Sequence, residues 1–421
     1  MMSQTTNTQT ISSERLASNV RRVLALSFFQ TFMVIIPVAV PFFASKGLDM
    51  QAVFTLQAIF ALVIVLCEVP SGYIADVLGR KLTLVVGAFF YGVGNSLLVV
   101  ADGFWGLAAF ELCLAIGASL VSGADLAMIY DTEIALGTRA KPINRTGRVV
   151  GQLMAARNYA EGLAALACSA ALLWGLEYAA YAQAAVGWVP LLIALTLVEP
   201  PGERLEVGNY GGNMMRILRH LLADDALVRQ VFLALSIWSL STFYSVWLVQ
   251  KIWQDHGLEL VHFGYLWGGL AVVAGLAGHA AYALEARLGA IRLLIFIAVA
   301  PVMGYVGLAE LGLVGGIAAT SLFFAARGFG LAILREAFNA RLPGEFRATA
   351  NSLASFGFRG AYVITGPFVG YLLDLYGMHT LLWLLAGVAM FLGLVLIYPL
   401  IAMLALRDLG GPAEKLPQAS S

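Results

Sequence analysis

The stretch Glu68–Lys81 reads EVPSGYIADVLGRK and joins two long apolar segments through a short charged turn. Its core is the pattern Gly72-x3-Asp76-x2-Gly79-Arg80-Lys81. A pattern of this length can arise by chance in a chain with 44 glycines. Its meaning therefore depends on the segments that lie on either side of it.

The composition of the chain is that of a membrane protein. Of its 421 residues, 60% are hydrophobic and 12% are charged, and the mean hydropathy is +0.84. An ordinary soluble domain has about 25% charged and about 45–50% apolar residues, so we expect a polytopic membrane protein. The formal net charge is zero, which gives no indication of a nucleic-acid partner. Cys67, Cys113 and Cys168 lie within apolar runs and lack metal-ligand spacing, so no metal site is expected.

The apolar runs predict membrane-spanning helices. A helix needs about 20 mainly apolar residues to cross about 30 Å of hydrocarbon, and its backbone groups are then hydrogen-bonded internally. This rule predicts an all-α polytopic protein with twelve transmembrane helices. They are expected at residues 22–44, 52–74, 82–101, 104–130, 149–174, 178–198, 229–251, 261–284, 291–309, 311–334, 349–373 and 380–404.

The distribution of Lys and Arg predicts the orientation. These residues collect in the loops on one side of the predicted helices, whereas the opposite loops hold only Lys46 and Lys251. The positive-inside rule therefore places both termini and the Asp76–Lys81 turn in the cytoplasm. Residues 1–19 are polar and lack the apolar core of a signal peptide, so the first span is expected to serve as the insertion signal.

The longest polar stretch separates six predicted helices from six. Within it, Met214–Leu222 has apolar residues at helical spacing, which predicts an amphipathic helix on the cytoplasmic surface. Arg145 and Arg157 recur at the same spacing as Arg347 and Arg359, as two related halves with a pseudo-two-fold repeat would give. The expected domains are a cytoplasmic tail (1–19), a six-helix bundle (20–198), a cytoplasmic linker (199–228), a second six-helix bundle (229–405) and a second cytoplasmic tail (406–421).

The loop after the second span can now be interpreted. It resembles the loop signature of the major facilitator superfamily of membrane transporters, which lies between helices 2 and 3 on the cytoplasmic side of two six-helix bundles. Val77 stands where the family usually has a basic residue. The resemblance implies that helices 1, 4, 7 and 10 line a central cavity. It also implies that Asp76 and Arg80, with Lys81 beside them, help to lock the outward-facing state, while Gly72 and Gly79 allow close backbone approach.

Two markers of the drug–proton antiporters in that family are missing. Those proteins usually carry an Arg in span four, four residues before a Gly, but here Cys113 takes that place before Gly117. They also carry a Gly-Pro-x-x-Gly element in span five, which in this chain occurs in span eleven as Gly366–Gly370. Multidrug antiport is therefore not supported by its own markers.

Ionisable residues inside the spans are candidates for function, because each costs about 2.5–3.5 kcal/mol on insertion scales. Glu111, Asp125 and Glu161 are the candidates for proton coupling, since a carboxylate in a water-poor cavity holds a proton more readily. The candidates for binding an anionic cargo are three arginines and four further side chains on the cavity helices: Arg157, Arg327, Arg359, Gln30, Ser241, Tyr244 and Trp247.

The structural alternative is that these charges form ion pairs that hold helices and gates together. Arg157 and Glu161 are spaced i,i+4 and can neutralise one another. Glu68, at the start of the signature stretch, can face Arg359 across the interface between the bundles and so act as a gate residue. Asp131 can face the arginines of the loop that follows it.

The chain has no P-loop for ATP and nothing that resembles the catalytic site of an enzyme. We expect a monomeric secondary active transporter of the bacterial inner membrane, which uses the proton gradient and no cofactor. The expected function is efflux of a small amphipathic or anionic organic molecule, such as a drug, metabolite or siderophore, by alternating access. The alternatives are proton-coupled uptake of a small anionic nutrient, or a transporter-like lipid flippase or receptor. The expected partners are the cargo and the lipid bilayer.

Overall fold

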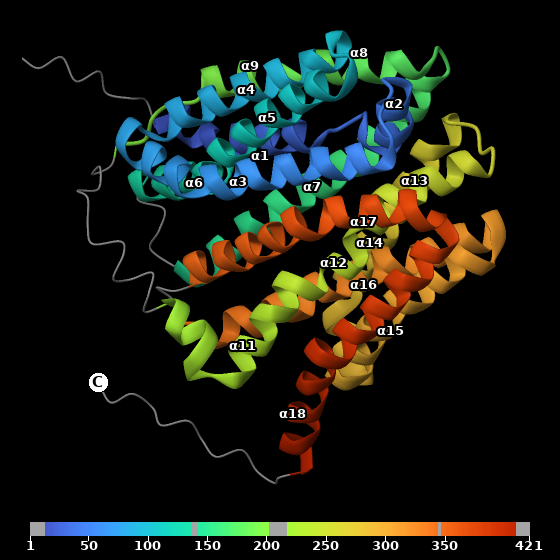
Figure 1. Cartoon of the computed structure of the whole chain (residues 1–421). Coiled ribbons are helices and arrows are strands. Elements are labelled where there is room, and N and C mark those ends of the chain that lie inside the picture. The colour runs from blue at the N-terminus through green and yellow to red at the C-terminus, as the bar shows by residue number, and fades with distance from the viewer. Residues whose placement is uncertain (1–12, 137–141, 202–216, 344–346, 410–421) are drawn as a thin grey trace, which may run out of the picture. The chain divides into compact units, whose positions relative to one another are not determined.

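The computed structural model describes residues 13–136, 142–201, 217–343 and 347–409, and within them every regular element is helical (Figure 1). The first half contains α1 (Ser13–Thr31), the 3-10 turn η1 (Ile36–Val38), α2 (Ala39–Ser45), α3 (Met50–Leu78), α4 (Arg80–Val100), α5 (Gly103–Val121), α6 (Ala124–Ala135), α7 (Pro142–Leu172), α8 (Leu176–Gly187) and α9 (Val189–Thr196). The second half contains the π-helical turn η2 (His220–Asp224), α11 (Ala226–Leu233), the π-helical turn η3 (Ala234–Trp238), α12 (Leu240–Phe243), α13 (Ser245–Asp255), α14 (Val261–Leu288), α15 (Ala290–Glu310), α16 (Gly312–Arg341), α17 (Arg347–Leu392), the π-helical turn η4 (Gly393–Ile397) and α18 (Tyr398–Leu409).

The helices are consistent with the twelve predicted spans. Ten helical segments of the described ranges are long and apolar enough to cross a membrane. The 57-residue segment Thr349–Ala405 contains a break at Gly377, where φ is +77°, and so accounts for two predicted spans. The helix α7 is 31 residues long, but its charged residues keep its hydropathy low. The predicted all-helical fold class is confirmed.

Several predicted spans are divided into shorter helices, among them the first and the fourth. The first is broken between α1 and α2, where Pro37 lies in η1 and cannot donate a backbone hydrogen bond. The fourth is broken between α5 and α6 at Gly123, whose φ of +85° is a conformation that glycine adopts without a steric penalty. Because of this break, Asp125 lies in the first turn of a new helix rather than in the middle of a long one.

The chain divides into two compact units. The first consists of residues 1–47 and 59–208, and the second of residues 48–58 and 209–421. The start of α3 belongs to the second unit, in which a Cβ at Gly370 would lie 2.7 Å from the Cα of Gln51. The last change of unit, after residue 208, falls within the predicted linker.

Small residues bring helices of the first unit into close contact. The helix α4 packs against both α5 and α8, and the three run side by side in Figure 1. A Cβ at Gly117 of α5 would lie 2.8 Å from the backbone oxygen of Gly87 in α4. Such close approach of backbones is how helices associate in lipid, where the hydrophobic effect does not drive them together. On its other side α4 is joined to α8 by a 2.8 Å hydrogen bond from Gln183 to Asn95.

The segment before α11 packs on protein. Residues 214–216 of the predicted amphipathic helix lie outside the described residues, and the part from Ile217 onward is helical. Ile217 and Leu221 are 5% and 0% exposed and belong to the apolar core of the second unit. Asp225 then caps α11 by accepting hydrogen bonds from two backbone amides of its first turn. Ile217 and Leu221 thus pack on the second unit, whereas Leu222 is 44% exposed.

Candidate functional site

A buried cluster of charges lies in the first unit, where α1, α6 and α7 meet. Asp125 is 2% exposed, and its Oδ2 accepts a hydrogen bond from Nη2 of Arg157 at 2.7 Å. The same oxygen accepts a hydrogen bond from the hydroxyl of Ser27 at 3.1 Å. Oδ1 accepts from the amide of Leu126 at 2.7 Å, within the first turn of α6, where the helix dipole favours a negative charge. Both oxygens of the carboxylate are therefore hydrogen-bonded, as a buried charge requires.

The structure gives Arg157 a partner that the sequence analysis did not name. Its guanidinium pairs with Asp125 and not with Glu161, so the predicted i,i+4 neutralisation is wrong. Within the described ranges Glu161 forms no ion pair and is half-buried. Glu111, the third candidate for proton coupling, is 4% exposed on α5. Asp125 thus has a described cationic partner, which Glu161 lacks, and this partner carries a charge that a cargo anion can also use.

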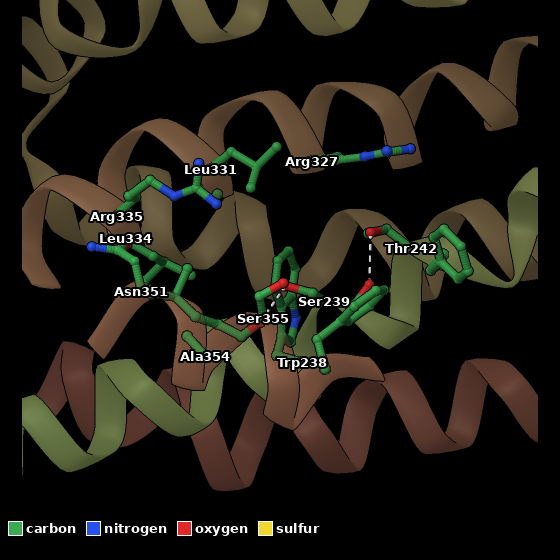
Figure 2. A pocket seen from close by; sticks show the side chains of 14 residues that line it. Trp238, Ser239, Thr242, Arg327, Leu331, Leu334, Arg335, Asn351, Ala354 and Ser355 are labelled. Carbon is green, nitrogen blue, oxygen red and sulfur yellow. Dashed lines mark hydrogen bonds between the residues drawn. The ribbon is translucent and has the colours of Figure 1, made fainter. Parts of the chain in front are cut away.

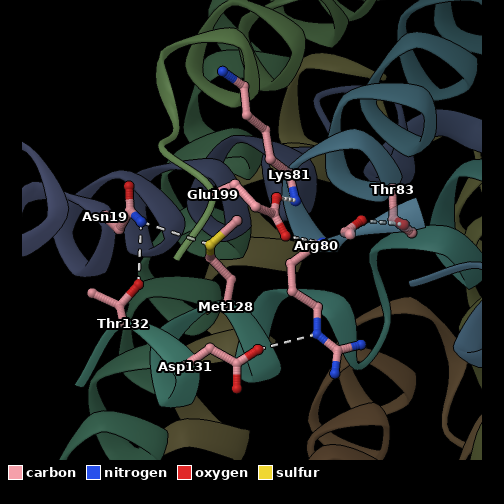
Figure 3. Close-up of polar contacts among 9 residues, drawn as sticks. Asn19, Arg80, Lys81, Thr83, Met128, Asp131, Thr132 and Glu199 are labelled. Carbon is pink, nitrogen blue, oxygen red and sulfur yellow. Dashed lines mark hydrogen bonds and ion pairs between the residues drawn. The ribbon is translucent and has the colours of Figure 1, made fainter. Parts of the chain in front are cut away.

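The signature stretch covers the end of α3, Gly79 and the start of α4, and Figure 3 shows its last residues, Arg80 and Lys81. Gly79 has φ of +100°, and it places the first amides of α4 against the carboxylate of Glu199. That carboxylate accepts hydrogen bonds from the amides of Arg80 and Lys81 at 2.8 and 2.7 Å. The side chain of Arg80 turns the other way and donates from Nε to Asp131 at 3.3 Å. The loop is thus fixed to the end of α9 and to α6 within the same unit.

Asn19 ties three more segments together beside this loop (Figure 3). Its amide donates to the hydroxyl of Thr132 at 3.1 Å and to the carbonyl of Val198 at 2.7 Å. Its oxygen accepts from the amide of Val198 at 3.1 Å. The ends of α1, α6 and α9 therefore meet at one place in the first unit, and Asn19 is 0% exposed there.

Several predicted gate contacts are not decided by the described atoms. The surroundings of Gly72 and the side chains of Asp76, Arg145 and Arg148 are not described, so the role of Asp76 stays a prediction. The contact of Asp131 with Arg80 is the one that the structure gives. Glu68 belongs to the first unit and Arg359 to the second, so their pairing also stays a prediction.

A pocket of about 200 Å³ lies in the second unit between η3–α12, α16 and α17 (Figure 2). Two arginines of α16, Arg327 and Arg335, line it. The opposite walls carry polar and aromatic side chains, among them Thr242, Phe243 and Asn351. The pocket combines an apolar wall with cations and hydrogen-bonding groups, as binding sites for small organic molecules usually do.

The other predicted binding residues are placed as follows. Arg359 donates from Nη1 to the hydroxyl of Ser355 at 2.5 Å. Ser241, Tyr244 and Trp247 are buried in the second unit and do not line this pocket. Tyr244 donates its hydroxyl to that of Thr365 at 2.6 Å. Gln30 lies in the first unit, where its backbone oxygen accepts a hydrogen bond from Tyr91 at 2.7 Å.

The sequence interpretation missed several residues of these sites. Glu199 was seen only as the opening of a polar linker, although a carboxylate directly after a span can cap a neighbouring helix at the same end. Ser239 and Thr242, spaced i,i+3, and Asn351 and Ser355, spaced i,i+4, line the pocket. Polar residues at such spacing on an apolar helix were a signal for it. Among the described residues no group of three or more His, Cys, Asp or Glu side chains is arranged to hold a metal ion.

Comparison with solved structures places the fold among membrane transporters. A mutant of the nucleoside transporter NupG has a TM-score of 0.72 at 14% sequence identity, covering 91% of this chain and 99% of that one. The peptide transporter POT in complex with sulfate has a TM-score of 0.70 at 14% identity, with 92% and 95% covered. A D-xylose-proton symporter has a TM-score of 0.67 at 13% identity, with 91% and 96% covered. At these identities the likeness shows the fold alone.

The family itself is shown by the sequence. The profile described as Major Facilitator Superfamily matches residues 23–341, which is about three quarters of the chain. No curated protein sequence matches the chain. The family match includes the signature loop, both charges of the Asp125–Arg157 pair and the two pocket arginines of α16. The chain belongs to the major facilitator superfamily and is a multi-pass membrane transporter of that family.

Proposed function

We propose that this chain is a proton-coupled secondary active transporter of a small organic anion, working by alternating access in the bacterial inner membrane. Asp125 carries the coupling proton, and Arg157 binds the anionic group of the cargo. The single observation that carries the proposal is the buried ion pair between these two side chains at 2.7 Å. Asp125 belongs to the fourth span, which the family resemblance assigns to the cavity, and Arg157 to the fifth.

The pair suits this role because its members differ in exposure. The side chain of Asp125 is 3% exposed, whereas that of Arg157 is 35% exposed. An anion therefore reaches Arg157 more readily than a cation reaches Asp125. When the anion takes over the guanidinium, the carboxylate loses its countercharge in a buried place, and it then binds a proton.

The sign of the coupling follows from this exchange. Binding of the anion favours binding of the proton, and by thermodynamic linkage the proton favours the anion to the same degree. Two ligands that bind together also cross together, so the cluster supports symport. An inward proton gradient then drives uptake of the anion, which was the alternative to efflux.

Efflux remains a second candidate for a different cargo. Antiport requires that cargo and proton exclude one another. A cationic amphipathic molecule that pairs with the carboxylate of Asp125 competes with the proton for it, and the same cluster then exports that molecule against protons. The charge of the cargo therefore decides the direction.

Reconstitution tests the proposal. The full-length protein is placed in liposomes that contain a pH dye. When small monocarboxylates, dicarboxylates or organic phosphates are added outside, protons should enter the lumen together with the anion, and the dye should report acidification. Asp125→Asn should abolish this proton movement while anion-for-anion exchange persists, because the neutral amide resembles a permanently protonated acid. Glu161→Gln, which removes another carboxyl group of the same bundle, is the matched control and should stay coupled.

Three results would count against the mechanism. Proton movement that is unchanged in Asp125→Asn would remove Asp125 as the coupling site. Protons that leave the lumen against an entering cation would establish antiport and replace the anion model. No proton movement with any anion, under either gradient, would remove proton coupling altogether.

A further inference from the structure

The pocket of the second unit has a positive charge that nothing inside it neutralises. Arg327 and Arg335 are two helical turns apart, about 12 Å along α16, and both line the pocket. Among the described residues none that lines it is acidic, and neither guanidinium has an ion-pair partner there. Arg327 is half-buried within its span, whereas Arg335 is exposed. An unpaired Arg inside a span is costly, so a pocket that keeps Arg327 there, with Arg335 as a second cation, is suited to an anion.

The walls of the pocket are aromatic. Trp238, Phe243 and Phe358 line it, and the rings of Phe243 and Phe358 meet edge to face with centroids 5.2 Å apart. Figure 2 shows Trp238 lying across the pocket from the α16 arginines. Aromatic rings prefer offset or edge contacts with other rings, so such a wall favours a ring on the ligand. The volume of about 200 Å³ is below the about 300–1,000 Å³ of pockets for drug-sized molecules. The site is therefore of a size for a single aromatic ring with its substituents.

The polar groups of the pocket are hydrogen-bond acceptors toward a ligand, because their own protons are already used. The hydroxyl of Ser239 donates to the carbonyl of Leu235 at 2.9 Å, and that of Thr242 donates to the carbonyl of Ser239 at 3.1 Å. The amide nitrogen of Asn351 donates to two oxygens, at 2.6 and 2.7 Å. What remains on all three side chains are oxygen lone pairs. These are suited to an O–H or N–H group of the ligand.

We propose that this pocket binds a small aromatic carboxylate that also carries a hydroxyl or amino group. The carboxylate pairs with Arg327 or Arg335, the ring packs on the aromatic wall, and the donor group bonds to the oxygens of Ser239, Thr242 or Asn351. The place of this site on the transport route rests on the proposed function. Binding itself does not, and it is measurable without any transport.

Four probes of one skeleton separate the parts of the proposal. 4-Hydroxyphenylacetate has the ring, the carboxylate and the hydroxyl. Phenylacetate lacks the hydroxyl, 4-hydroxyphenethyl alcohol is neutral, and tyramine is a cation. Isothermal titration of the full-length protein in detergent should give the tightest binding for 4-hydroxyphenylacetate. Phenylacetate should bind more weakly, and the neutral and cationic probes at least about tenfold more weakly than the first, as expected when a charge-assisted hydrogen bond is lost.

Matched variants place the binding in this pocket. At least one of the variants Arg327→Gln and Arg335→Gln should weaken the binding of 4-hydroxyphenylacetate about 10- to 100-fold, the range of one hydrogen bond to a charged group. Thr242→Val keeps the shape of the side chain and should remove the preference for 4-hydroxyphenylacetate over phenylacetate. Arg292→Gln, on the exposed side of α15, is the control and should leave all affinities unchanged. Thermal unfolding of each variant checks that it is folded.

The outcomes separate this inference from the proposed function. Failure of all four probes to bind, equal affinity for the acid and the neutral alcohol, or unchanged affinity in both arginine variants would overturn the pocket. Asp125→Asn should keep the binding of 4-hydroxyphenylacetate while it loses proton coupling. Binding without any proton-coupled flux would therefore refute only the proposed function, whereas proton-coupled flux of other anions without binding of these probes would refute only the pocket.

Discussion

Removal of Arg157 should expose how strongly it interacts with Asp125. In Arg157→Gln the carboxylate of Asp125 stays buried, with Ser27 and one backbone amide as its remaining partners. A neutral amide cannot replace the cation. We therefore expect this variant to be less stable than Asp125→Asn, in which the arginine that is left alone keeps a third of its side chain in contact with solvent.

The magnitude follows from distance and burial. Two unit charges about 4 Å apart attract one another by about 4 kcal/mol at an effective dielectric constant of about 20. The 35% exposure of Arg157 lets water and salt screen part of this attraction. We expect Arg157→Gln to cost about 2–3 kcal/mol and Asp125→Asn about 1–2 kcal/mol. The double variant should cost less than the sum of the two by a coupling energy of about 2 kcal/mol.

Equilibrium unfolding in mixed micelles measures the four states of this cycle. A second cycle, which combines Arg157→Gln with Glu161→Gln, is the control. Glu161 lies one helical turn from Arg157 and has no described ion pair. The losses of unfolding free energy in these two single variants should therefore add up within about 0.5 kcal/mol. If the losses in Asp125→Asn and Arg157→Gln also added up within this margin, the observed pair would carry no interaction energy. That result would refute the reasoning behind the coupling mechanism as well.

Three further predictions concern packing and hydrogen bonding, and thermal unfolding in detergent tests each. Gly117→Ala should lower the free energy of unfolding by about 1–3 kcal/mol, because its Cβ would lie 2.8 Å from a backbone oxygen of α4. In the control Gly162→Ala the new Cβ meets nothing within 4 Å, so this variant should be neutral or stabilising. Equal effects of the two substitutions would contradict the close crossing of α4 and α5. Glu199→Ala should lower the free energy of unfolding by about 1–2 kcal/mol, because two amides of α4 lose their acceptor. Glu199→Gln should lose less, since its side-chain oxygen can still accept a hydrogen bond. No loss in either variant would show that water replaces the cap. Tyr244→Phe should cost about 0.5–1.5 kcal/mol, since its 2.6 Å bond to Thr365 is lost while Thr365 keeps its own bond to a helix carbonyl; a larger loss would point to a packing role.

The candidate site was only partly predictable from the sequence. Asp125 and Arg157 were both recognisable as charges inside apolar runs, because hydropathy marks them without any knowledge of the fold. Their partnership was not, since the two residues are on different helices and their approach depends on the break at Gly123. The i,i+4 rule favoured Glu161 instead, because it treats each helix as if it were alone.

The signature loop and the pocket show the same limit. Gly79 was expected to allow close backbone approach. The group that approaches it is the carboxylate of Glu199, which lies 120 residues later in the chain and could not be paired with Gly79 from the sequence. Arg327 was predicted as a binding residue from its depth in its span. Its neighbours Thr242 and Asn351 come from other spans, and only the packing of α12 and α17 against α16 brings them to it.

The sequence by itself determined that this is a helical membrane protein, in which parts of the chain its apolar helices lie, and to which family it belongs. These properties depend on hydropathy along the chain and on a short local motif, and both are one-dimensional. The tertiary structure alone decided which side chains meet: Asp125 with Arg157, Glu199 with the first amides of α4, and two arginines of α16 with an aromatic wall. The reason is physical, because in lipid the rotation and neighbours of each helix are set by close packing of small residues and by pairing of buried polar groups.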